Sequence, residues 1–378
     1  MKALGALFAF LFILLIGGGV AAVVLLPKFT GPGPLEAEKD MVIARGTGIS
    51  AIGHQLEKEG VIRSYYAFRL HHVLDGTPDL KAGEYLFGPH ETLQNVIMKM
   101  ATGEVVVRKV TVPEGTTSAA VVEMLKQEKA LTGDIAAIPP EGSLAPDTYR
   151  FAYGDSRQGL IDQMQKEMQA AVDNIWAQRD ADTPLQNPQQ MVALASIVEK
   201  ETGLAAERPR VAGVYVNRMR KNMLLQSDPT VIYGITHGAG PLARPITITD
   251  LTTPTPYNTY TQQGLPPGPI ANPGKASLMA AAKPEKHEFI YFVADGSGGH
   301  KFAATLEQHN QNVAAWRQFQ KGGAALTAPA PPPSMPTPVA APALVPAQTP
   351  PPQPVAQPAP QPVKAVKAAV KHKKKRKH

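Results

Sequence analysis

NPQQMVALASIVEKETG, residues 187–203, is the stretch from which the fold of the chain is best predicted. It opens with Asn, a favourable N-cap, and Pro, which suits a first helical turn, and it closes with Gly, a typical helix stop. Between these ends, Met191–Val198 is apolar almost all round, which indicates a helix buried inside a globular domain. The helix nevertheless ends in Glu199-Lys200-Glu201-Thr202. Carboxylates at the end of a buried helix indicate a functional site.

The two glutamates of this stretch point in different directions. Two positions along a helix correspond to about 200°, so at most one of Glu199 and Glu201 faces a cleft. Glu201 shares its face with Leu194, Ile197 and Val198. These apolar neighbours favour a raised carboxyl pKa, as a neutral general acid needs. Spacing alone leaves both glutamates as candidates, and it leaves open a frayed helix end at which both are solvated.

Upstream of this helix the chain predicts two α+β parts. In residues 41–107 a strand-like Val-Ile pair, a Gly-rich turn and helical spacing follow one another, and the pattern returns 69 residues later in residues 108–185. A tyrosine element, GEYLF and then DTYRF, recurs as well. The second part ends in a long helix expected from Ser156 to Trp176. Residues 41–107 resemble a LysM-like module, which binds N-acetylglucosamine chains; a plain α+β spacer is the alternative.

The N-terminal residues predict a membrane anchor. Residues 3–26 contain no charge over 24 positions, and about 20 apolar residues span a bilayer. A cleaved signal peptide is the alternative, but its apolar core is normally shorter. We therefore expect residues 1–2 on the cytoplasmic side, a single transmembrane helix at 3–26, and a Pro/Gly-bearing linker at 27–40. The body would then lie outside the inner (plasma) membrane, in the periplasm or its equivalent.

The C-terminal residues differ in composition from the rest. Residues 321–378 are rich in Pro and Ala and are expected to be disordered, and the chain ends KHKKKRKH. The formal charge of +7 is concentrated there, because residues 1–363 carry a net charge of −1. A near-neutral body argues against a nucleic-acid enzyme with a basic face. The tail is expected either to bind an anionic surface or to be solvated without a partner.

Several classes of chemistry are excluded by the residues that are absent. The chain has no cysteine, which excludes a disulfide scaffold, a zinc–thiolate site and a thiol nucleophile. No histidine pair has the spacing of a zinc site, and no nucleotide-binding or GxSxG motif occurs. We expect neither a metal ion nor a cofactor.

Five motifs in order resemble the endolytic murein transglycosylase, or YceG-like, family. The resemblance runs from about residue 41 to 320 and is dense from 190 to 315. The motifs are LASIVEKETG (194–203), ERPRVAGVYVNRM (207–219), LQSDPTVIYG (225–234), TPYNTYTQQGLPPGPIANPG (255–274) and YFVADGSGGHKFAATLEQHNQNV (291–313). The long Pro/Ala tail departs from the usual pattern.

The resemblance implies a lyase and its site. Such an enzyme cleaves nascent peptidoglycan strands internally, between N-acetylmuramic acid and N-acetylglucosamine, and leaves 1,6-anhydro ends. The family's catalytic glutamate matches Glu201, with Glu199 as the alternative. The family-like loops are polar and rich in amides and aromatic rings, as suits a sugar cleft. The residues expected to line it are Gln226, Asp228, Tyr233, Asn258, Tyr260 and Asn272.

The resemblance also implies a fold, partners and a role. The fold would be α+β, with a catalytic region at 186–320 built around the buried glutamate-bearing helix. The partners would be peptidoglycan strands and penicillin-binding-protein synthases, with no nucleic acid, and the enzyme would terminate glycan elongation. Two alternatives remain. A lysozyme-type hydrolase would need a second carboxylate, Asp228 or Asp250; a non-catalytic LysM-type scaffold would bind the wall only.

Overall fold

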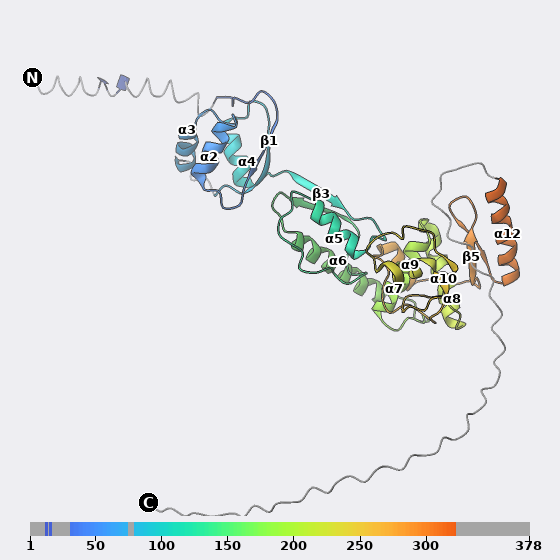
Figure 1. Cartoon of the computed structure of the whole chain (residues 1–378). Coiled ribbons are helices and arrows are strands. Elements are labelled where there is room, and N and C mark those ends of the chain that lie inside the picture. Colours follow the sequence, from blue (N-terminus) through green and yellow to red (C-terminus); the bar gives the residue numbers. More distant parts are fainter. Residues whose placement is uncertain (1–11, 14, 17–30, 75–78, 323–378) are drawn as a thin grey trace, which may run out of the picture. The chain divides into compact units, whose positions relative to one another are not determined.

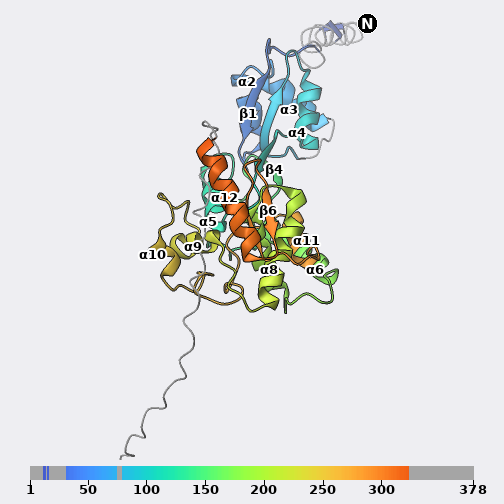
Figure 2. The ribbon, with the colours of Figure 1, turned by 90° about the vertical axis from the view of Figure 1, so that its right-hand side faces the viewer.

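A computed structural model describes residues 12–13, 15–16, 31–74 and 79–322 of the chain (Figure 1). Across these residues the architecture is α+β, with many helices and three separate two-stranded antiparallel sheets (Figure 2). The α+β class expected from the sequence is confirmed. Nearly all of the predicted transmembrane segment 3–26, and the predicted tail beyond residue 322, lie outside the described residues. Within the described ranges, no helix combines the length and the apolar character needed to cross a membrane.

The first unit has the order strand–helix–helix–strand–helix. Its elements are β1 (Lys39–Ile43), α2 (Ile49–Lys58), α3 (Tyr65–Leu74), β2 (Gly83–Phe87) and α4 (Leu93–Thr102). β1 pairs antiparallel with β2, with Lys39 opposite Phe87 and Ile43 opposite Gly83. One apolar core joins all five elements, because Leu56, Phe68 and Ile97 are fully buried in it. The LysM-like character of this unit and its binding of glycan stay predictions.

The residues just before β1 belong to this folded unit. The backbone N–H of Gly33 donates to the carbonyl of His90 (3.2 Å), and that of His90 donates to the carbonyl of Leu35 (2.9 Å). A Cβ on Gly33 would come within 2.2 Å of the carbonyl oxygen of Glu91, so only glycine fits this approach. Part of the linker expected at 27–40 is therefore packed against the unit.

The second part repeats the strand–turn–helix pattern. It contains β3 (Val107–Thr111), α5 (Ser118–Gln127), β4 (Thr148–Ala152) and the long α6 (Arg157–Ala177), and β3 pairs antiparallel with β4. The recurring tyrosines occupy equivalent places: the hydroxyl groups of Tyr85 and Tyr149 each donate, at 2.7 Å, to the carbonyl four residues earlier. The long helix lies within one residue of its expected bounds, and Ser156 caps it.

The third part is built around α7 (Pro188–Glu201). Asn187 caps the helix by accepting a hydrogen bond from the backbone of Gln190 (2.9 Å), and Met191–Val198 is buried throughout, as expected. The helix packs against α6, α8 and α11. The other elements of this part are η1 (Ala205–Glu207), α8 (Arg208–Arg220), α9 (Asp228–Thr236), α10 (Ile248–Thr252), α11 (Lys275–Ala282), β5 (Tyr291–Ala294), β6 (His300–Ala303) and α12 (Leu306–Gly322).

Candidate active site

Glu201 is the last residue of α7, and its carboxyl lies where three helices meet. Its Oε1 accepts a hydrogen bond from the hydroxyl of Tyr215 on α8 (2.8 Å). The same oxygen accepts one from the hydroxyl of Ser227 (2.5 Å), the N-cap residue of α9. Glu201 is half-buried. Both bonds use one oxygen, so the other, Oε2, is left to carry a proton.

The surroundings of Glu201 favour its neutral form. Burial raises the pKa of the carboxyl above its ordinary value, and the nearby charge of Asp228 raises it further. The hydroxyls of Ser227 and Tyr215 stabilise the charged form and lower the pKa, and so does His300, but burial outweighs them. A raised carboxyl pKa favours the protonated form that a general acid needs.

Glu199, the alternative candidate for the catalytic glutamate, has a structural role. Its side chain is 5% exposed and forms an ion pair with Arg208 at 2.8 Å. Its other oxygen accepts the backbone N–H of Gly274, the N-cap of α11, at 2.9 Å. Arg208 also pairs with Glu114 (3.0 Å). Glu199 therefore joins α7 to α8 and α11, and it has no free oxygen with which to meet a substrate.

Asp228 and Tyr260, two of the residues proposed to line the cleft, lie close to Glu201. The hydroxyl of Tyr260 donates to Oδ1 of Asp228 at 2.5 Å, and Asp228 is buried. Among the described residues, its second oxygen, Oδ2, has no hydrogen-bond partner. Burial raises the pKa of Asp228. Asp228 thus supplies a second carboxyl close enough to act on the first.

Gln226 is placed next to this pair by the backbone of its loop. It adopts a left-handed conformation (φ 51°), and its N–H donates to the carbonyl of Thr259 at 3.0 Å. The hydroxyl of Thr259 also accepts the backbone N–H of Ser227 at 2.9 Å. The loop is therefore fixed where Ser227 meets Glu201, and the Gln226 side chain is half-buried.

Asn258 and Asn272 do not line a cleft, which corrects the expectation for both. Each is fully buried. The amide nitrogen of Asn258 donates to the carbonyls of Asp250, Leu251 and Thr253. Asn272 accepts the N–H of Leu144 (2.9 Å) and donates to the carbonyl of Thr116 (2.9 Å). Their side-chain amides form hydrogen bonds with buried backbone groups of the loops, which would otherwise lack hydrogen-bond partners.

Tyr233 belongs to a separate cluster around Glu141. Its ring packs on Tyr257, with ring centres 4.8 Å apart. Glu141, which the sequence analysis missed, accepts the backbone N–H of Ser118 at 2.8 Å, and burial raises its pKa. It lies in a Pro-rich loop without helical or strand periodicity, so no pattern marked it.

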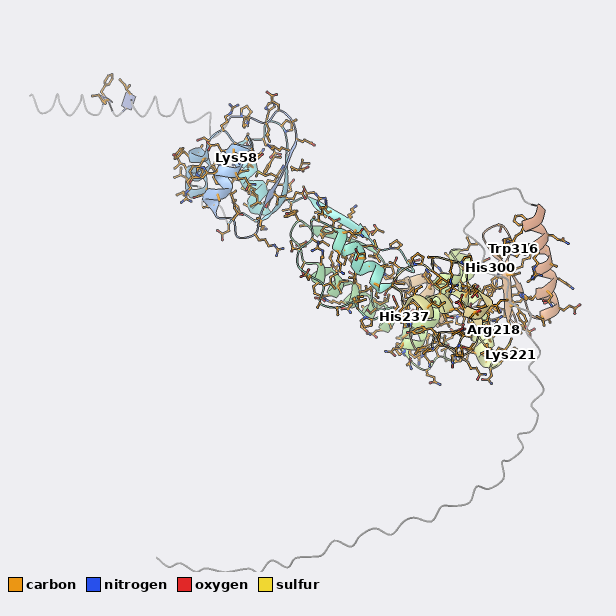
Figure 3. All side chains as sticks on the ribbon, viewed as in Figure 1. Lys58, Arg218, Lys221, His237, His300 and Trp316 are labelled. Carbon is orange, nitrogen blue, oxygen red and sulfur yellow. The ribbon has the colours of Figure 1, made fainter. Side chains whose placement is uncertain are left out.

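Three further groups near Glu201 come from motifs whose residues had not been assigned roles. Arg218, labelled in Figure 3, is 2% exposed. It donates to the carbonyls of Ile290 and Leu225, both at 2.7 Å. His300 Nδ1 lies 2.7 Å from Glu207. Tyr215 and Arg218 share the buried face of α8, and a tyrosine and an arginine on an otherwise apolar face could have indicated their role.

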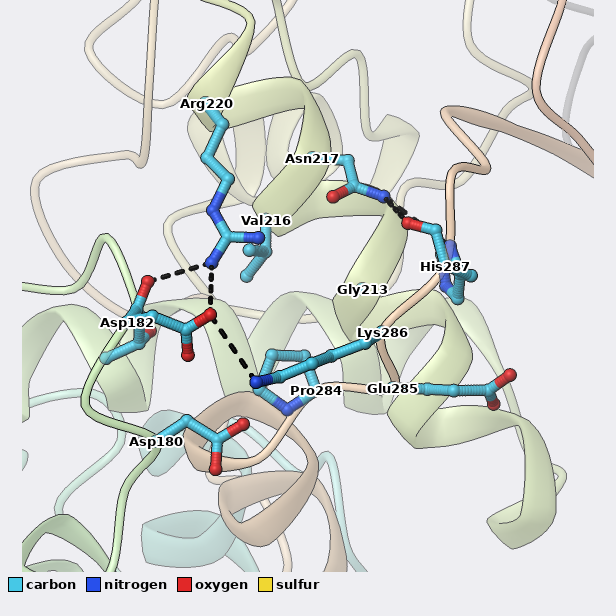
Figure 4. A pocket seen from close by; sticks show the side chains of 11 residues that line it. Asp180, Asp182, Gly213, Val216, Asn217, Arg220, Pro284, Glu285, Lys286 and His287 are labelled. Atoms are coloured by element: carbon cyan, nitrogen blue, oxygen red, sulfur yellow. Dashed lines mark hydrogen bonds and ion pairs between the residues drawn. The ribbon is translucent and has the colours of Figure 1, made fainter.

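A cavity lies on another face of α8. Its volume is about 120 Å³, and it is lined by Asp180, Asp182, Asn217, Arg220 and Lys286, among others (Figure 4). Asp182 pairs with both Arg220 (3.3 Å) and Lys286 (3.5 Å). Asn217 and Arg220 lie about 160° and about 140° around the helix from Tyr215, whose hydroxyl bonds Glu201, so this cavity lies on a different face of α8 from the Glu201 site.

The chain is similar to several known proteins. An endolytic murein transglycosylase of Bacillus subtilis is 32% identical over 71% of this chain and 82% of its own length. One of Streptococcus pneumoniae is 26% identical over 72% of this chain but only 57% of its own length, so the chain spans little more than half of that relative. A crystal structure of a YceG-like protein from Listeria monocytogenes aligns with 73% of this chain and 99% of its own, at 30% identity and a TM-score of 0.44.

The family assignment rests on the extent of the match. The sequence profile of the YceG-like family matches residues 41–315, which include both candidate glutamates and every loop discussed above. The enzyme names of the relatives, together with this match, confirm the expectation of an enzyme of the lyase class. The chain belongs to the YceG-like family.

Proposed function

We propose that this protein is a lytic transglycosylase that cleaves peptidoglycan glycan strands, with Glu201 as its acid and base. The observation that carries the proposal is the half-buried carboxyl of Glu201, bonded by two hydroxyls and shifted toward its neutral form. Its place in the family and the names of its relatives support the same activity and substrate.

One carboxyl suffices for the proposed reaction. Neutral Glu201 gives its proton to the glycosidic oxygen, and the bond from that oxygen to C1 of the muramyl sugar breaks with an oxocarbenium-like transition state. The carboxylate so formed takes the proton of the C6 hydroxyl of the same sugar, and that oxygen bonds to C1. Because the nucleophile is already attached, proximity replaces activation of a water molecule. The products are a 1,6-anhydro end and a free hydroxyl.

The neighbours of Glu201 suit this cycle. The hydroxyls of Tyr215 and Ser227 fix the carboxyl and stabilise it when it becomes charged. Burial and Asp228 oppose that charge, so the group regains its proton readily. Burial is the largest of these opposed effects, so the net shift of the Glu201 pKa is upward.

A lysozyme-type hydrolase is the second candidate, and the closeness of Asp228 favours it. A hydrolase needs a second carboxylate to attack C1 or to activate water. Asp250, the other aspartate considered, is held by Arg244 and by the cap of α10, which lower its pKa. Asp228 is the one of the two that lies near Glu201, but burial raises its pKa and so reduces its readiness as a nucleophile.

Product analysis separates these candidates. The full chain and its Glu201→Gln variant are incubated with uncrosslinked peptidoglycan strands, and the products are measured by mass spectrometry. Glu123→Gln, at an exposed position of α5, is the matched control. We expect internal fragments one water lighter than reducing-end products, from the parent and the control only. Reducing ends would favour the hydrolase, and no cleavage by the folded parent would favour a non-catalytic wall-binding scaffold.

We propose further that residues 3–26 anchor the protein in the inner membrane with the body outside. Twenty-four residues without charge support this assignment. A membrane-held enzyme would meet strands as synthases such as penicillin-binding proteins release them, would end their elongation, and could bind them through its LysM-like unit. Protease added outside sealed spheroplasts should degrade the body, whereas a body that is protected until lysis would contradict this orientation.

A further inference from the structure

Helix α3 of the first unit, which Figure 1 labels, carries a face of large apolar side chains that are exposed. Ala67 and Phe68 point into the core. The opposite side carries large side chains at positions i, i+4, i+7 and i+8, which lie within about 100° of one another. They are Tyr66, Leu70, Val73 and Leu74, with exposed fractions of 81%, 44%, 62% and 71%. We call these four residues the α3 apolar face.

Charge around this face suits an anionic surface. The helix sequence YYAFRLHHVL contains no acidic residue. Arg69, which is exposed, lies about 40° to one side of the face, and the exposed Arg63 comes just before the helix. An apolar stripe flanked by arginine is the pattern of a helix that lies in the interface of a membrane with anionic lipids.

The path of the chain brings α3 close to where a membrane would be. The guanidinium of Arg63 donates a hydrogen bond to the carbonyl of Pro32 at 3.0 Å. The segment that precedes β1 therefore leaves the unit beside the start of α3. The backbones of Gly33 and Leu35 form hydrogen bonds with the backbone of His90 in the same unit. Only residues 27–31 separate this attachment from the apolar segment 3–26. Five residues extend over at most about 18 Å.

We propose that the α3 apolar face docks on the outer surface of the phospholipid bilayer and fixes the orientation of the first unit against it. This inference rests on the proposed membrane anchor at residues 3–26. The short tether gives the face a high effective concentration at the lipid surface, so a contact too weak to hold a free protein is sufficient. Arg69 would meet lipid phosphates while Leu70 and Leu74 enter the acyl boundary.

Site-directed spin labelling tests this proposal on the full chain, which has no cysteine of its own. Single nitroxide labels are attached at Leu70→Cys on the face, at Ile13→Cys in the anchor, and at Lys58→Cys, an exposed site on α2. The chain is reconstituted in nanodiscs of phosphatidylcholine and phosphatidylglycerol. Collision of each label with oxygen, which enters lipid, is compared with collision with a water-soluble nickel chelate.

We expect the nitroxides at residues 13 and 70 to be several-fold less accessible to the nickel chelate than to oxygen. The nitroxide at residue 58 should show the reverse. Adding Leu74→Ser should lower the lipid contact of label 70, whereas adding Gln94→Ser, on the exposed side of α4, should not.

Three results would overturn the inference, and they differ from one another. Label 70 in water with label 13 in lipid would leave the anchor standing and refute the docking. Label 13 in water would refute the anchor and the docking with it. Protection of label 70 together with strong spin–spin coupling between chains would mean that a second copy covers the face.

Discussion

At the scale of single residues, the hydroxyl groups of Ser227 and Tyr215 and the carboxyl group of Asp228 influence the protonation of the Glu201 carboxyl. Ser227 and Tyr215 favour the charged form, and burial with Asp228 favours the neutral form. An acid that must also act as a base needs such a balance. Changing one partner at a time should therefore move the pH dependence in a direction that the structure predicts.

Ser227→Ala removes the bond that most strongly lowers the pKa of Glu201. The pKa of the carboxyl should rise, and the alkaline limb of the kcat/KM profile should move to higher pH, because the neutral acid survives longer. The profile is measured by product formation at a series of pH values. Ser50→Ala, in the first unit, is the control and should leave the limb in place. A limb that moves to lower pH would contradict this account.

Glu201→Gln should make the folded protein more stable relative to the parent as pH rises. The folded pKa of Glu201 is raised, so the folded state binds the proton more tightly than the unfolded chain does. The parent then loses stability from the unfolded pKa, about 4.3, upward to the folded pKa, and the amide variant does not. Urea unfolding at several pH values measures this difference. A constant difference across that range would show that the folded pKa is not raised.

Glu199→Gln should act on stability instead. It leaves Arg208 buried with only the more exposed Glu114 as a charged partner. We expect a loss smaller than the ~3–5 kcal/mol typical of breaking a fully buried pair, because that second partner remains. Unfolding by urea gives the loss, and Glu123→Gln is again the matched control. Full stability with abolished cleavage would reverse the roles assigned to the two glutamates.

Helix positions could be predicted from the sequence, whereas the partners of their end residues could not. The caps at Asn187 and Ser156 and the apolar run of α7 are local signals, and the structure confirms them. The choice between Glu199 and Glu201 depends on Arg208 and Tyr215, which another helix brings in. Helical spacing contains no information about such contacts between elements, so it left both glutamates open.

At the scale of elements, the loop from α10 to Tyr260 is held by one amide. The polar side chains that suggested a sugar cleft form hydrogen bonds to the backbone here. The side chain of Asn258 donates to three carbonyl groups and accepts from the N–H of Tyr260. Polar residues in Gly- and Pro-rich loops have this role as often as a binding role, and one sequence does not distinguish them. Tyr260 reaches Asp228 only because this loop is fixed.

Asn258→Ala should therefore lower stability and distort the loop. It leaves buried carbonyls without their donor, at a cost of about 1–3 kcal/mol for each that water cannot reach. Thermal and urea unfolding measure the loss, and Asn310→Ala, at an exposed position of α12, should cost little. An unchanged stability with a raised KM would show instead that Asn258 touches substrate.

At the scale of the whole molecule, the described contacts of the site lie between Glu114 and His300. The partners of Glu201, Glu199 and Asp228 all fall in this interval. The Pro/Ala-rich tail and its basic end lie outside this interval of the sequence, so we predict that cleavage does not need them.

A chain ending at Gly322 should cleave soluble glycan strands as fast as the full chain and give the same products. Initial rates measured by chromatography of the fragments check this expectation, with a chain that carries the tail and Glu201→Gln as the inactive reference. A large fall in rate for the shortened chain, with its folding intact, would show that the tail contributes to catalysis.

The central claim is that Glu201 drives an internal attack by the sugar's own C6 hydroxyl. Cleavage in water labelled with oxygen-18 tests this claim most directly, because only hydrolysis takes an oxygen atom from the solvent. We predict muramyl ends that contain no label, produced by the parent protein and not by Glu201→Gln. Incorporation of one labelled oxygen per cleaved bond would contradict the account and make Asp228 the second carboxylate of a hydrolase.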